Sequence, residues 1–137
     1  MSGSDLVSSG VVLLLVITIA WGGTFLLRVV SGAVGTNELQ QTYFRAGHAH
    51  AGVLVILGLV VRLLMVDVAL PRWLAPLPDL VLYAAVLMPA GFFLSVTGRN
   101  PDRPNRLRYL IHLGAGALGI GLAAAGVGLI MAGVRAG

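Results

Sequence analysis

The sequence predicts an all-α integral membrane protein, a bundle of four transmembrane helices that forms a single domain over residues 1–137. Hydrophobic residues make up 58% of the chain and charged residues only 10%, whereas soluble domains carry about 25% charged residues. The charged residues gather at a few points and leave four long uncharged stretches between them. Because a bilayer core of about 30 Å requires roughly 20 helical residues, each stretch is a candidate span.

The expected spans are defined by the charges that bound them. The first follows Asp5 and is kept as a helix, since its leader has no positive charge and no cleavage site follows it, unlike a signal peptide. The second is long enough if Arg62 lies at the headgroups with its stem extended outward. The expected spans are about 6–30, 44–66, 79–98 and 109–134.

Local signals refine these boundaries. Asn37 and Gln40 are typical of a capping box, with Asn37 as the N-cap and Gln40 at the third helical position. The second helix can therefore begin before its apolar stretch. Pro89 predicts a kink in the third span, because proline removes a backbone donor. Gly22 and Gly23 predict a packing notch in the first span.

The arginines predict the orientation. With four spans, both termini and the second loop lie on one side of the membrane, and the first and third loops lie on the other. Six arginines flank or occupy the first and third loops, against three on the opposite side, which are Arg62, Arg72 and Arg135. Under the positive-inside rule, both termini lie outside the cell membrane and the first and third loops are cytoplasmic. The six are Arg28, Arg45, Arg99, Arg103, Arg106 and Arg108.

The same arginines indicate which partners to expect. Those of the third loop are expected to meet the anionic headgroups of the lipid bilayer. They belong to no separate basic domain that would bind nucleic acid, so nucleic acid is not expected as a partner.

The fourth span contains two series of glycines at seven-residue spacing. Five residues separate the two series, so they lie about 140° apart around a helix. Small residues mark close contacts between helices in membranes. Either this helix is the central helix of one bundle, or one series packs on a second copy in a homo-oligomer or on another subunit of a larger complex. The series are Gly114, Gly121 and Gly128, and Gly119, Gly126 and Gly133.

The histidines form the candidate functional site. His48 and His50 lie at the cytoplasmic start of the second span, and His112 lies at the same end of the fourth. Ionisable groups within spans usually face a bundle interior, so this histidine cluster is the default site hypothesis. His48 and His50 are about 200° apart around a helix, so only one of them can point toward His112. The polar layer around them comprises Arg28, Glu38, Tyr43 and Arg45.

Several roles remain open for these histidines. His112 and one histidine of the second span can ligate haem iron axially, and Gly47 and Gly52 leave room for the macrocycle. Alternatively, one histidine pair and Glu38 can hold a divalent metal. The histidines can also bridge helices through hydrogen bonds, or take part in a proton-linked process.

The segment Arg45–Gly52, which reads RAGHAHAG, is the recognisable part of the chain. Through it the chain resembles short four-span membrane proteins of actinobacterial type. The segment is also similar to the histidine-bearing helix starts of membrane haem proteins. The first resemblance implies the four-span fold and carries no activity.

The sequence offers no catalytic group, so an enzyme is not expected. No hydroxyl lies near a base in sequence, and no pair of carboxylates is placed for acid–base work. Asp67 and Asp79 bound the second loop and are expected to pair with Arg62 and Arg72 instead.

Three hypotheses of function follow, in order of preference. The first is an oligomeric or accessory subunit that interacts within the membrane, for which the glycine series suffice. The second is a haem- or metal-binding membrane protein that uses His112 with His48 or His50. The third is a small oligomeric channel or transporter, which the lack of any charge at mid-membrane disfavours.

Overall fold

A computed structural model of the protein describes residues 3–137. Helices make up 78% of the described chain, and it contains no strand. Four helices are long and apolar enough to cross a membrane. The first two are α1 (Gly3–Val30) and α2 (Glu38–Leu64). The third joins the 3-10 helix η1 (Leu77–Asp79) to α3 (Leu80–Ser95), and the fourth joins the 3-10 helix η2 (Arg106–Arg108) to α4 (Tyr109–Ala136). The prediction of an all-α protein with four such helices is confirmed.

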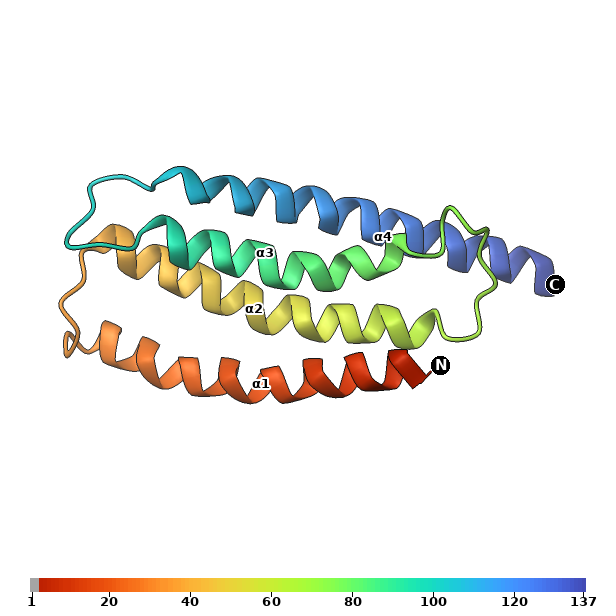
Figure 1. The fold of residues 1–137 in the computed structure, drawn as a ribbon, viewed down its shortest axis with the longest axis horizontal. Helices are drawn as coiled ribbons and strands as arrows, with labels where there is room; N and C mark the ends of the chain where they lie inside the picture. The colour runs from red at the N-terminus through yellow and green to blue at the C-terminus, as the bar shows by residue number, and fades with distance from the viewer. Residues whose placement is uncertain (1–2) are drawn as a thin grey trace.

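The helices run side by side in the order of the chain (Figure 1). α2 packs on α3 and α3 packs on α4, whereas α1 has its main contacts with α2. α3 is therefore an inner helix and α4 lies at an edge. Of the two alternatives for the fourth helix, a place at the centre of one bundle does not agree with the structure, because α3 is the one long helix with which α4 makes its main contacts in the described chain.

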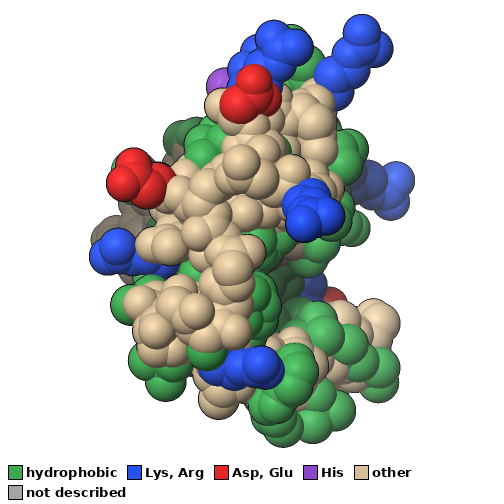
Figure 2. Space-filling model, turned by 90° about the vertical axis from the view of Figure 1, so that its left-hand side faces the viewer, with side chains coloured by type: hydrophobic (Ala, Val, Ile, Leu, Met, Phe, Trp, Pro, Cys, Tyr) green, Lys and Arg blue, Asp and Glu red, His purple; other side chains and the backbone are tan. Residues whose placement is uncertain are grey.

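Two groups of buried side chains join the inner helices. The first contains Leu54 of α2 and Met88 of α3, and Val16 of α1 packs against it. The second contains Val61 of α2, Val81 of α3 and Ala125 of α4. Figure 2 shows the molecule from the end that carries the first and third loops. In this view a cleft separates the lowest part of the molecule, which is α1 in Figure 1, from the rest. α1 is thus the least embedded helix, and Val29 is its one buried residue among those described.

Glycines bring the backbones of α3 and α4 into contact. A Cβ on Gly91 of α3 would lie 2.7 Å from the backbone nitrogen of Ile111. A Cβ on Gly121 of α4 would lie 2.9 Å from the backbone nitrogen of Val81. Any side chain at these positions would hold the two helices apart. One glycine series of α4, at positions 114, 121 and 128, therefore packs within the chain.

The second glycine series of α4 faces away from the molecule. No atom lies within 4 Å of the Cβ position of Gly119, Gly126 or Gly133. The two series thus differ in their surroundings although they share the same spacing.

The predicted capping box begins α2 and also holds the third loop. The Asn37 side chain accepts a hydrogen bond from the Gln40 backbone at 2.9 Å, and the Gln40 side chain accepts one from the Asn37 backbone at 3.2 Å. The Gln40 amide also donates to the carbonyls of Val96 and Gly98, both at 3.1 Å. The start of α2 therefore fixes the position of the loop between α3 and α4.

The two glycine series predict opposite effects of the same substitution. Gly121→Ala should lower the free energy of unfolding by about 1–3 kcal/mol, because the added Cβ meets the Val81 backbone. Gly126→Ala, the matched control, enters open space within the single chain, so at protein concentrations that keep the chain monomeric in detergent it should be neutral or stabilising by up to about 1 kcal/mol, since alanine favours helix. Denaturation in detergent, followed by circular dichroism, measures both. Equal losses of stability would contradict the assignment of the inner face of α4.

Candidate functional site

His48 lies on the side of α2 that faces α1. Its Nε2 atom is 3.6 Å from the position that a Cβ of Gly23 would take, and its Nδ1 atom is 3.8 Å from that of Gly22. The two glycines therefore form the predicted packing notch, because a side chain longer than alanine would meet the imidazole. Next to it, the rings of Phe25 and Phe44 pack edge to face with centroids 5.7 Å apart. His48 thus belongs to the contact between α1 and α2.

His50 lies against α3. Its ring centroid is 4.9 Å from that of Phe92, and its Nδ1 atom lies 2.7 Å from the carbonyl oxygen of Ala46. Because a carbonyl only accepts hydrogen bonds, Nδ1 carries the proton of the neutral ring and Nε2 keeps its lone pair. Over residues 3–137 no buried side-chain nitrogen or oxygen lacks a hydrogen-bond partner, and Nε2 of His50 forms no hydrogen bond in that range. Nε2 of His50 is therefore accessible, beside a hollow of about 170 Å³ that Val53 also lines.

His112 is exposed on α4. Its ring centroid is 6.3 Å from that of Tyr109, on the same helix. His112 precedes Gly119 by seven residues, the interval of the open glycine series, so it lies on the same face of α4 as that series. This face carries no other part of the described chain at Gly119, Gly126 or Gly133.

The three histidines thus have three different surroundings: α1 for His48, α3 for His50, and the outer face of α4 for His112. The residues that the structure describes contain no group of three or more His, Asp or Glu side chains placed to hold a metal ion. The set of one histidine pair with Glu38 is therefore not assembled. Gly47 leaves no room for a macrocycle either, because Phe93 of α3 fills that space, 2.9 Å from the Cβ position.

The predicted polar layer is spread over the surface of this end. Glu38 lies in the first turn of α2, where a carboxylate is favourable to the helix dipole, and Arg28 and Arg45 are exposed. Within residues 3–137, Arg28 and Glu38 form no ion pair with each other. Tyr43 is half-buried, with its ring 5.7 Å from that of Phe92.

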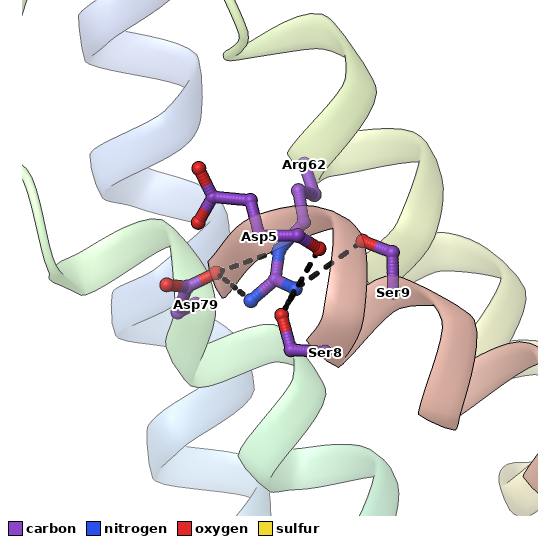
Figure 3. A network of polar contacts seen from close by, with 5 residues as sticks. All are labelled: Asp5, Ser8, Ser9, Arg62 and Asp79. Atoms are coloured by element: carbon purple, nitrogen blue, oxygen red, sulfur yellow. Dashed lines mark hydrogen bonds and ion pairs between the residues drawn. The ribbon is translucent and has the colours of Figure 1, made fainter. Parts of the chain in front are cut away.

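A network of polar side chains lies at the opposite end of the molecule, around Arg62 (Figure 3). Its Nη2 atom donates to Oδ1 of Asp79 at 2.8 Å, and its Nη1 atom donates to the hydroxyls of Ser8 at 2.6 Å and Ser9 at 3.4 Å. Of the pairs expected among Arg62, Arg72, Asp67 and Asp79, the structure contains Arg62 with Asp79, and Arg72 and Asp67 form no ion pair in the described part of the chain.

The Arg62 side chain is only 16% exposed, so its guanidinium is turned into the protein rather than extended toward headgroups. Three segments meet there: α1 through the serines, α2 through Arg62, and η1 through Asp79. A hollow of about 210 Å³ borders the contact and is lined in part by Asp5, Arg62 and Asp79. The contact of the two serines with Arg62 was not predicted from the sequence. Their signal was a pair of adjacent hydroxyls just inside the first span, at the end of the bundle that also carries Arg62.

Removing the guanidinium should loosen α1. Arg62→Gln should lower the free energy of unfolding by about 1–2 kcal/mol, because it leaves Asp79 and the serine hydroxyls without their donor. Arg72→Gln is the matched control, since Arg72 is exposed at the same end of the molecule. Protease sensitivity of α1 and thermal unfolding in detergent measure the effect. Two variants of equal stability would show that the contact contributes nothing.

Comparison of the chain with known protein families, with curated proteins and with solved structures found no match.

Proposed function

We propose that this protein is a subunit of a membrane assembly, and that two copies pair through the outer face of α4. One observation supports this most directly: Gly119, Gly126 and Gly133 repeat every seven residues along a face on which nothing of the described chain packs. The equivalent series on the other side of α4 is filled by neighbours. Small residues let backbones approach closely, and in a bilayer such packing drives helix association.

A second copy of the chain is the partner that this face fits best. Copies inserted with the same topology are related by an axis along the membrane normal, so their α4 helices run parallel. A two-fold contact then places each glycine opposite its equivalent, and a seven-residue repeat keeps the seam in register along a left-handed pair. Such a pairing requires no change within the chain.

Disulfide trapping tests this pairing cleanly, because the protein has no cysteine. Gly119→Cys should form an intermolecular disulfide on mild oxidation, since equivalent glycines would lie within the reach of a disulfide, about 4.4–6.8 Å between Cα atoms. Ile120→Cys is the control at the same depth, exposed but about 100° around the helix. Non-reducing electrophoresis of membranes reads both results. If both variants crosslink alike, or neither does, the open face of α4 is not the seam.

Replacing a glycine of the same face by a larger residue tests the pairing without oxidation. Gly126→Leu should raise the dissociation constant of the dimer about tenfold or more, because the side chain holds the helices apart. Gly10→Leu is the control, since Gly10 on α1 also has open space at its Cβ position. Energy transfer between labelled copies in bilayers measures the dissociation constants.

We further propose a cell membrane location with both termini outside. The support is the excess of arginines at the first and third loops, which the positive-inside rule assigns to the cytoplasm. A reporter active only in the cytoplasm should be silent when fused after Gly137 and active when inserted next to Arg103. The reverse pattern would invert the orientation.

A further inference from the structure

The strongest concentration of positive charge lies at the start of α4. A hollow of about 470 Å³ is lined there by Arg103, Pro104, Asn105, Arg106, Arg108 and Tyr109. Three of these six residues are arginines and none is acidic, and the arginine side chains are exposed. Arginines project from the rim of this end of the molecule (Figure 2). We refer to this feature as the arginine hollow.

Hydrogen bonds hold the hollow in place. The backbone nitrogen of Asn105 donates to the carbonyl of Ser95 at 2.7 Å, and its side-chain amide donates to the carbonyl of Leu94 at 3.0 Å. The Asn105 side chain also accepts from the backbone of Leu107 at 2.8 Å. Asn105 thereby ties the arginine segment to the end of α3. A charged surface held in this way loses less conformational entropy on binding than a free chain does.

The arginines do not converge on one point. Arg106 and Arg108 are two residues apart in a 3-10 helix, which has three residues per turn, so they leave the helix in different directions. The guanidinium carbon of Arg108 lies 5.6 Å from the centre of the Tyr109 ring, which holds it on the α4 side. Arg103 precedes them in the loop. Guanidinium groups bind phosphate through paired hydrogen bonds, so separate arginines fit separate phosphates.

An apolar track continues from the hollow along α4. Leu113 follows Tyr109 by four residues and therefore lies on the same face, and it is 61% exposed. Ile120, seven residues further, is also exposed. A ligand that fits both features has anionic groups at one end and apolar chains at the other.

We propose that the arginine hollow binds the headgroup of an acidic phospholipid that carries two phosphates, with its chains along Leu113 and Ile120. The shared chemistry is a pair of phosphates, and a lipid rather than a soluble bisphosphate is the source because the apolar track leads directly away from the hollow. This site is independent of the proposed pairing through the glycine face. It adds a defined lipid site to the general attraction between basic loops and anionic membranes.

Lipid binding by the full chain in neutral detergent micelles tests the proposal. The probes are fluorescent cardiolipin, with two phosphates, and fluorescent phosphatidylglycerol, with one, compared at equal phosphate concentration. Cardiolipin should bind at least tenfold more tightly. Arg106→Gln and Arg108→Gln should each weaken cardiolipin binding about fivefold, whereas Arg72→Gln, an exposed arginine at the other end of the bundle, should leave it unchanged.

Two further measurements distinguish a lipid from a soluble bisphosphate as the ligand. Soluble glycerol bisphosphate, which has no chains, should compete only weakly, and Leu113→Gln should reduce the affinity for cardiolipin without changing that for the soluble compound. Equal binding of the two lipids per phosphate, or an equal loss in Arg72→Gln, would overturn the proposal and leave only diffuse attraction. Competition by the soluble compound at the same concentration as lipid would overturn the lipid assignment.

Discussion

The close approach of the α3 and α4 backbones is the constraint on which the rest of the structure depends. Gly91 and Gly121 place backbone against backbone, which no larger residue permits. Because α4 packs on one side of α3 and α2 packs on another, α3 is an inner helix, although it is the shortest of the four. The outer face of α4, with its second set of glycines and His112, is left open as a direct result.

Features that depend on neighbours in sequence were predictable, and features that depend on which helix lies next to which were not. The capping box of Asn37 and Gln40 is a local pattern, and it forms as expected. The pairing of Arg62 with Asp79 was predictable because both residues flank the same loop. The contacts of Gln40 with the carbonyls of Val96 and Gly98 were not, since nothing in the sequence relates residues more than fifty positions apart.

The histidines illustrate the same limit. Helical geometry correctly separates His48 from His50, because a separation of about 200° holds in any regular helix. Geometry of one helix does not say which neighbour each ring meets, and here the neighbours are the glycine notch of α1 and Phe92 of α3. The two glycine series of α4 raise the same difficulty. Their spacing is identical, so only the positions of the neighbouring segments, α3 and the loop before it, distinguish the packed series from the open one.

The way in which α1 is attached has a consequence for the order of assembly during synthesis. α1 leaves the ribosome first, yet both groups that hold its ends, His48 and Arg62, belong to α2. Arg62 in turn meets its carboxylate only after Asp79 has been made. α1 can therefore pack only once α2 has followed, and the contact at Arg62 is complete only after more than half of the chain has been made. Its attachment is thus completed in two steps, first at the glycine notch that receives His48 and then at Arg62.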